Sequence, residues 1–178
     1  HLHSTKEVPY GLSRYMFNFI LQSAKIFIFD FLIGNTDRHQ SNWAVLLNGA
    51  LRICPIYDNG SSLCCYIEEN RLESYFSNDM IRFNALVDTK SRSRLRINGK
   101  IKKEPTQKEV LLYLFTHFQQ ITRHFCDIVN EKVNKDSIRY IIERYSDSII
   151  SSIRKELIYR YILRKVEIMN EVVFGKEE

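Results

Sequence analysis

Long apolar runs are missing from the 178-residue sequence. The longest candidate, Ile26–Ile33, is interrupted by Asp30 and falls well short of the roughly 20 residues that a bilayer-spanning helix needs. We find no signal peptide, no internal repeat and no low-complexity tract. The sequence therefore predicts a globular protein without a transmembrane segment.

Cysteine is sparse and poorly spaced for metal binding. The four thiols belong to Cys54, Cys64, Cys65 and Cys126, and no C-x-x-C pair occurs. The adjacent pair at 64–65 suits neither a disulfide nor a metal site. We interpret all four as reduced thiols, which argues against structural zinc and predicts a cytoplasmic location.

Glycine is scarce as well: the six glycines are scattered, and no G-x-G pattern occurs. A glycine-rich loop that cradles phosphates is therefore absent from this sequence. A sizeable core is still expected, because 44% of the residues are hydrophobic and 12% are aromatic. The length suits one domain, or the larger lobe of a two-lobed protein.

The net charge of +5 is unevenly distributed. Residues 90–103 carry seven basic side chains and no acidic one. The Asn98-Gly99 pair is typical of a tight turn, and three alternating arginines would share one face of a strand. We therefore predict a basic hairpin, either simply solvated or in contact with phosphate groups. These arginines are Arg92, Arg94 and Arg96.

The apolar pattern predicts a mainly α-helical domain with one small hairpin. A dense apolar helix is expected after an N-cap at Ser13 and before a stop at Gly34, and we expect it to be largely buried. Two short apolar runs flank Asn48-Gly49 and predict a β-hairpin that ends at Pro55 and the Asp58-Asn59-Gly60 turn.

The rest of the chain divides into an irregular part and a helical part. Residues 61–104 look like a long polar segment, which in a compact domain is usually functional or mobile. Helices are expected over 105–133, over 135–146 with Asn134 or Asp136 as cap, and over 148–174 with a stop at Gly175. We treat the chain as one domain, with its motifs in 33–63, the polar and basic segment in 64–104, and the helical region in 105–175.

Polar side chains gather around the predicted hairpin. Asp37 and Asn42 precede its first strand, and Asp58 follows its second. Because a hairpin brings its ends together, we expect two carboxylates and one amide in one pocket. That set suits phosphoryl transfer, in which one aspartate orients a hydroxyl and the other groups bind the Mg²⁺ that bridges nucleotide phosphates. The alternative is that these residues only form turns.

The fuller motifs carry a resemblance to known kinases. The D-x-x-x-x-N spacing matches the protein-kinase catalytic loop, and the D-N-G triplet stands where D-F-G stands in those enzymes. The stretches "LIGNTDRHQSNW" and "PIYDNGSSL" resemble the C-terminal lobe of HipA-like serine/threonine kinases, which share I-G-N-x-D-x-H-x-x-N and P-x-Y-D. A weaker similarity is to type II phosphatidylinositol 4-kinases. The resemblance covers residues 30–63.

The resemblance implies a protein-kinase-like C-terminal lobe that uses ATP and Mg²⁺. Asp37 would be the catalytic base, and Asn42 and Asp58 would bind the metal on the ATP phosphates. Three further residues are expected to support catalysis or cofactor binding: His39 would hold the catalytic loop, Asn35 would pin its backbone, and Arg38 would contact a phosphate or pair with an acid.

The resemblance also implies what this chain does not supply. A kinase of this type needs a phosphate loop and a strand lysine, which we expect in an N-lobe absent from this chain, so the chain alone should have little activity. The expected acceptor is a protein, and candidate partners are an antitoxin or a DNA-binding protein. The alternatives are a phosphoinositide or small-molecule kinase, and a non-catalytic kinase-fold binding module.

Overall fold

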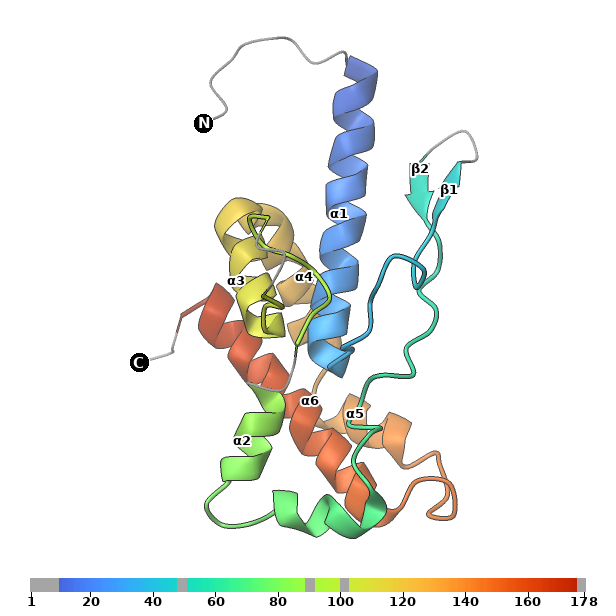
Figure 1. The fold of residues 1–178 in the computed structure, drawn as a ribbon, viewed down its shortest axis with the longest axis vertical. Coiled ribbons are helices and arrows are strands. Elements are labelled where there is room, and N and C mark those ends of the chain that lie inside the picture. The colour runs from blue at the N-terminus through green and yellow to red at the C-terminus, as the bar shows by residue number, and fades with distance from the viewer. Residues whose placement is uncertain (1–9, 48–50, 89–91, 100–102, 176–178) are drawn as a thin grey trace.

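The computed structural model describes residues 10–47, 51–88, 92–99 and 103–175. These residues are mainly helical, with one two-stranded antiparallel sheet (Figure 1). None of the described helices is long and apolar enough to span a membrane. The elements are α1 (Tyr10–Ile33), β1 (Val45–Leu47), β2 (Leu51–Ile53), the 3₁₀ helix η1 (Glu69–Tyr75), α2 (Ile81–Val87), α3 (Gln107–His117), α4 (Gln119–Lys132), α5 (Lys135–Ile142) and α6 (Ser152–Val173).

Among the α1 residues whose burial is described, 17–33, the buried positions begin at Ala24. Ala24, Ile28 and Phe31 belong to the main core, whereas Phe17 is more than half exposed. The predicted N-cap at Ser13 is wrong, because α1 already begins at Tyr10. Serine is tolerated inside helices, so its presence alone does not mark a helix start.

The β-hairpin is present as predicted. Its strands pair in antiparallel register, with Val45 opposite Ile53 and Leu47 opposite Leu51, and β2 contacts α1. The predicted turn at Asn48-Gly49 lies outside the described residues. The hairpin thereby brings the chain before β1 close to the chain after β2.

The segment after the hairpin is more ordered than the sequence indicates. It contains η1 and α2, which bury Leu72, Phe83 and Leu86 in the main core. The prediction of an irregular segment over 61–104 is therefore wrong for these two elements. Both are only seven residues long, which is too short to show a helical period, and η1 has only two apolar residues, Leu72 and Tyr75.

The predicted basic hairpin is also wrong over its described part. Residues 92–99 form no strand; their one ladder-type contact is an isolated bridge between Arg92 and Thr106. Asn98 and Gly99 do form a turn, with positive φ angles of 53° and 69°. Arg94 and Arg96 both lie within 3.5 Å of Glu104, so arginine-to-carboxylate contacts replace strand pairing here.

The long helix predicted over 105–133 is divided at Phe118 into α3 and α4. A capping box between Thr106 and Glu109 begins α3, and Phe118 has non-helical angles of φ −136° and ψ 48°. The apolar stripe continues through the break, so the sequence carries no signal for it. The division lets both helices pack against α1 and α6.

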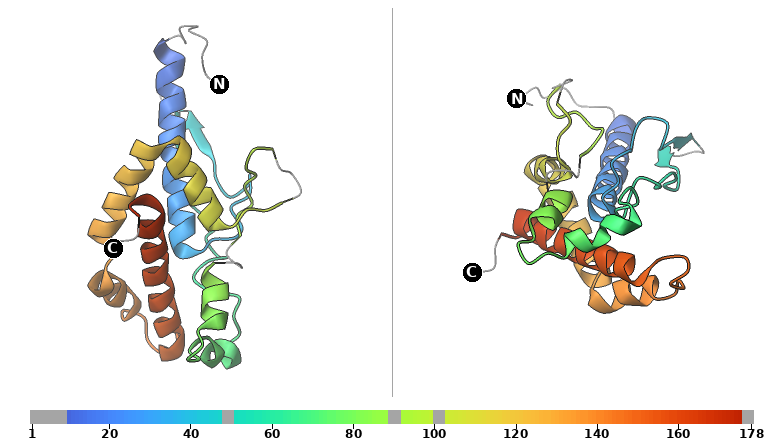
Figure 2. Two further views of the ribbon diagram at one scale, coloured as in Figure 1. Left: turned by 90° about the vertical axis from the view of Figure 1, so that its left-hand side faces the viewer. Right: turned by 60° about the horizontal axis from the view of Figure 1, so that its bottom comes forward.

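The C-terminal helices follow the prediction closely. Asn134 caps α5, accepting hydrogen bonds from the backbone of Asp136 and Ser137, and Gly175, with φ 86°, follows the end of α6. Helix α6 contacts α1, α3, α4 and α5, and it supplies Leu157, Ile168 and Met169 to the core. The two views of Figure 2 show α6 running beside the C-terminal end of α1, where the candidate site begins.

Candidate functional site

The loop after α1 turns sharply at Gly34. Gly34 has φ +68°, and a Cβ atom at this position would collide with the Tyr161 hydroxyl of α6. Two backbone hydrogen bonds then join this loop to the chain after β2: Thr36 N–H donates to Ser61 O at 3.2 Å, and Leu63 N–H donates to Ile33 O at 2.8 Å. The two polar motifs of the sequence are therefore held side by side.

Arg38 is buried between the two motifs. Its Nη2 lies 2.8 Å from Asp30 Oδ1 in an ion pair whose side chains are both less than 10% exposed. Its Nη1 donates to the carbonyls of Asn42 and Tyr57 at 2.7 and 2.8 Å, and its Nη2 donates to Asn59 Oδ1 at 2.5 Å. Of the two roles expected for Arg38, the structure shows the pairing with an acid.

Burial also acts on Asp30. Loss of water raises the pKa of its carboxyl group, and the ion pair with Arg38 opposes that effect. A charged residue within the apolar run of α1 needs such a partner, because an isolated buried carboxylate is strongly unfavourable. Asp30 is not among the site residues that the motifs predict, although its place inside an apolar run is a signal that could have revealed it.

Asn35 contacts the backbone of the loop, as expected for a residue that pins it. Its Oδ1 accepts a hydrogen bond from the Asp37 N–H at 3.1 Å, and its Nδ2 donates to Asp30 Oδ1 at 3.1 Å. Its carbonyl oxygen accepts a 2.6 Å bond from Gln107 Nε2. Gln107 is a second site residue that sequence reasoning missed, since nothing marks one buried glutamine among the polar residues at a helix start.

Asn42 is tied to the loop through one end of its amide. Its Nδ2 donates to the backbone carbonyl of Asp37 at 2.8 Å, and the side chain is buried. A primary amide that donates through nitrogen keeps its oxygen as an acceptor. The D-x-x-x-x-N spacing therefore corresponds to a specific contact between its two end residues.

The carboxylate of Asp37 is partly exposed and lies between two basic side chains. Arg94 Nε is 3.3 Å from Asp37 Oδ1, and His39 Nε2 is 3.8 Å from Oδ2. The Nδ1 atom of His39 accepts the Ser41 N–H at 3.2 Å, which orients the ring. Through Arg94, the described residues 92–99 thus reach the loop that carries Asp37.

Asp58 stands at an exposed turn and has a left-handed φ of 53°. The Tyr57 hydroxyl donates to Ser41 O at 3.0 Å, which fixes this turn against the first motif. No three His, Cys, Asp or Glu side chains gather into a metal site among the described residues. The expected Mg²⁺ ligands, Asn42 and Asp58, offer one amide oxygen and one carboxylate, which suits an ion that takes its other ligands from water and phosphate.

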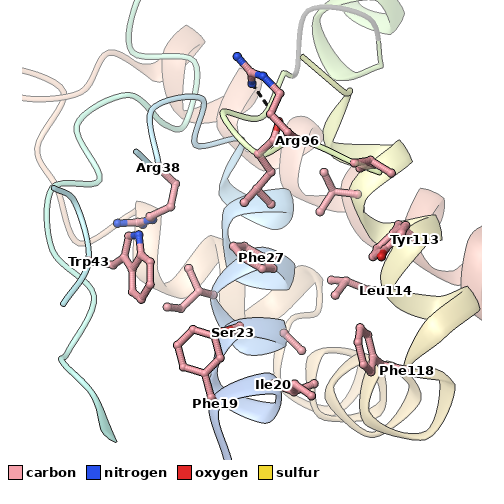
Figure 3. A pocket seen from close by; sticks show the side chains of 15 residues that line it. Phe19, Ile20, Ser23, Phe27, Arg38, Trp43, Arg96, Tyr113, Leu114 and Phe118 are labelled. Carbon is pink, nitrogen blue, oxygen red and sulfur yellow. Dashed lines mark hydrogen bonds between the residues drawn. The ribbon is translucent and has the colours of Figure 1, made fainter. Parts of the chain in front are cut away.

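An apolar pocket of about 300 Å³ opens beside the site. Figure 3 shows Arg38 and Trp43 on one side of it, and Tyr113, Leu114 and Phe118 on the other. Trp43 also lies 6.2 Å from Phe19, ring centroid to ring centroid.

The fold is similar to that of a known kinase. A structure of the proinflammatory kinase CtkA from Helicobacter pylori superposes with a TM-score of 0.70 at 20% sequence identity, covering 89% of this chain and 55% of that chain. The chain thus spans about half the length of that kinase. No family model and no curated protein matches the sequence. The helical fold with its small hairpin is therefore kinase-like.

Proposed function

We propose that this chain is the C-terminal lobe of an ATP-dependent, HipA-like serine/threonine protein kinase. The observation that carries the proposal is the 2.8 Å bond from Asn42 Nδ2 to the Asp37 carbonyl, within a loop held against the Asp58 turn in a kinase-like fold. Because this contact uses the amide nitrogen, it leaves the amide oxygen of Asn42 as a possible metal ligand. The three side chains required for phosphoryl transfer thus come from two joined loops.

The proposed chemistry assigns each residue one task. Asp37 orients the acceptor hydroxyl and takes its proton as the hydroxyl oxygen bonds to the γ-phosphorus of ATP, while the bond from that phosphorus to the β–γ bridging oxygen breaks. Asn42 and Asp58 hold Mg²⁺, which when bound neutralises charge on the phosphates. Asn35, Arg38 and His39 orient the loop. Arg38 acts through its ion pair with Asp30 and not through a phosphate.

The remaining parts of the kinase are proposed to lie in an N-lobe outside this chain. A lid over ATP requires a phosphate loop and a lysine, and the sequence offers no glycine-rich loop. We propose that the complete protein acts in the cytoplasm on a protein hydroxyl. An antitoxin or a DNA-binding protein is the proposed type of regulatory partner.

A phosphoinositide acceptor is the second candidate. The observation that favours it is the half-exposed guanidinium of Arg94 next to Asp37, since this cation could meet an anionic headgroup as it approaches the base. A comparison of protein and lipid acceptors distinguishes the protein kinase from the phosphoinositide kinase. The polypeptide that contains this chain and its N-lobe is incubated with Mg²⁺ and γ-labelled ATP, together with a protein mixture or with phosphoinositide vesicles.

We expect label on protein, lost in Asp37→Ala and in Asp58→Ala. Asp127→Ala, which changes an exposed aspartate on α4, is the matched control and should transfer as the wild type does. Label on lipid alone would select the second candidate. An absence of both transfer and Mg-ATP binding would support a non-catalytic binding module and overturn the proposal.

A further inference from the structure

We propose that Gln107 and Lys165 are positioning residues, which hold the Asp37 loop through a buried chain of hydrogen bonds. Lys165 Nζ donates to Gln107 Oε1 at 3.2 Å, and Gln107 Nε2 donates to the Asn35 carbonyl at 2.6 Å. All three residues are at most 3% exposed. The chain of bonds joins α6, the first residue of α3 and the loop after α1.

The chemistry of the three groups fixes the donor and the acceptor in each of these hydrogen bonds. A backbone carbonyl only accepts hydrogen bonds, and an ammonium group only donates them. In the observed orientation, Gln107 Oε1 accepts from the Lys165 ammonium and Gln107 Nε2 donates to the Asn35 carbonyl. A flipped amide would place its oxygen against the Asn35 carbonyl oxygen and its nitrogen against the Lys165 ammonium, so neither hydrogen bond could form. Lys165 therefore selects the orientation in which Gln107 donates to Asn35.

The series of hydrogen bonds continues from Asn35 to the proposed catalytic residues. The Asn35 side chain accepts the Asp37 N–H, and the Asp37 carbonyl accepts the Asn42 amide. A displacement of Asn35 would thus move the proposed base and one proposed metal ligand together. Rigid placement of such groups matters because small errors in position reduce the rate steeply.

Packing alone does not explain a lysine at position 165. Its ammonium lies 4.6 Å from the centre of the Phe31 ring and 5.3 Å from that of Tyr161. The nearby charge of Asp88 favours the ammonium, and the buried Oδ1 of Asp88 has no hydrogen-bond partner among the described residues. An apolar residue would fill this space without the cost of burying a charge. The Lys165 ammonium, by contrast, can donate to Gln107 and so orient its amide.

Amide hydrogen exchange of the wild-type chain and three variants tests the inference at pH 6. Lys165→Met removes the cation and keeps the volume. Gln107→Glu keeps the size and the contact with Lys165, but an ionised carboxylate cannot donate to Asn35. The matched control is Lys155→Met, which changes another buried lysine of α6, paired with Asp147 at 2.7 Å and outside the chain of bonds.

Faster exchange is expected at the amides of Asp37, His39 and Asn42 in Lys165→Met and Gln107→Glu. The expected ratio to Lys155→Met is roughly fivefold, the factor that a net hydrogen bond of about 1 kcal/mol gives. Equal exchange in all three variants would overturn the inference. If Lys165→Met does not fold, Gln107→Glu decides alone: wild-type exchange in its loop would overturn the inference.

The catalytic meaning of this chain of bonds rests on the proposed function, but the exchange experiment does not. Loop exchange that changes as expected, in a protein that transfers no phosphate, would reject the function and keep the structural link. The single tryptophan of the chain, Trp43, directly follows Asn42 and gives a second readout of the loop. Its fluorescence should shift in both variants and stay unchanged in Lys155→Met.

Discussion

Arg94 and Asp37 form an ion pair, with the guanidinium Nε 3.3 Å from the carboxylate Oδ1. The two residues are 57 positions apart, and the pair connects the basic segment to the loop after α1. Arg94 takes up one of the acceptor positions of this carboxylate, which leaves fewer for a hydroxyl that approaches Asp37. The proposed base thus stands in a partly exposed ion pair.

Removal of Arg94 should leave the fold intact and make Asp37 more accessible. Both side chains are more than a third exposed, so the pair should contribute less than about 1 kcal/mol to stability. We expect Arg94→Ala to change the free energy of unfolding by under about 0.5 kcal/mol and to raise kcat/KM for an uncharged acceptor about twofold, since a weak competitor is lost.

Arg92→Ala is the control for that experiment, because Arg92 donates to the Glu104 carbonyl and is not paired with Asp37. A loss of activity in Arg94→Ala that Arg92→Ala does not share would show that Arg94 takes part in transfer. That result would contradict the view that Arg94 only competes for the base.

The buried pair of Arg38 and Asp30 should be essential for stability. Arg38→Met leaves the Asp30 carboxylate buried without its cation and also removes donors to three oxygens. We expect the free energy of unfolding to fall by about 3–5 kcal/mol, measured by urea denaturation. Arg164→Met, which breaks two pairs that are more exposed, with Glu167 and Glu171, should lose under about 1 kcal/mol. Similar losses of unfolding free energy in both variants would show that the buried pair contributes no more to stability than an exposed one.

Two glycines with nearly equal φ angles allow a matched test of the turn after α1. Gly34 (φ +68°) packs against Tyr161, whereas a Cβ added at Gly99 (φ +69°) would meet no atom within 4 Å. Gly99→Ala should cost about 1–2 kcal/mol, for the left-handed conformation alone. Gly34→Ala should cost at least about 2 kcal/mol more, because Tyr161 must also move. Equal costs in thermal or urea unfolding would contradict the close contact with α6.

The pH dependence of stability should carry a signature of Lys165. Burial lowers the pKa of its ammonium to about 7, from an ordinary value of 10.5, and nearby Asp88 partly offsets this. Above pH 7 the folded state loses this proton while the unfolded state keeps it, so stability should rise with pH. The slope approaches about 1.4 kcal/mol per pH unit.

The measurement is the difference in unfolding free energy between the wild type and Lys165→Met, from pH 6 to pH 9. It should shift in favour of the wild type by about 2.5 kcal/mol across this range. The window ends there because the Cys64 thiol, whose pKa is raised to about 12 by burial, adds its own dependence above pH 9. A difference that does not change with pH would mean that Lys165 keeps its proton.

Local patterns predicted much of this molecule. Asn134 and Gly175 mark the limits of helices because capping chemistry is local, and the hairpin follows from two apolar runs around a turn. The break at Phe118 could not be predicted in this way, because only packing against α1 and α6 reveals it. The short helices η1 and α2 escaped notice because seven residues are too few to show a helical period.

The candidate site shows the same division. The closeness of the two motifs follows from hairpin topology, so Asp37, Asn42 and Asp58 could be named in advance as one group. The partners of Asp30 and Gln107 could not be named, because they are 8 and 72 residues away and depend on how α1, α3 and α6 pack; of the two residues, only Asp30 carries a sequence signal, its place inside an apolar run. In this protein the sequence named the proposed catalytic and metal-binding groups more readily than the residues that contact them.

The intact mass of the protein after incubation with Mg-ATP, compared between the wild type and Asp37→Asn, tests the central claim most directly. The substitution keeps the size of the side chain and the backbone bonds to Asn35 and Asn42, and removes only the carboxylate. With the N-lobe present, we predict one or more added phosphates on the wild type or its protein acceptor and none with Asp37→Asn. Equal phosphate transfer by both proteins would contradict the assignment of Asp37 as the catalytic base.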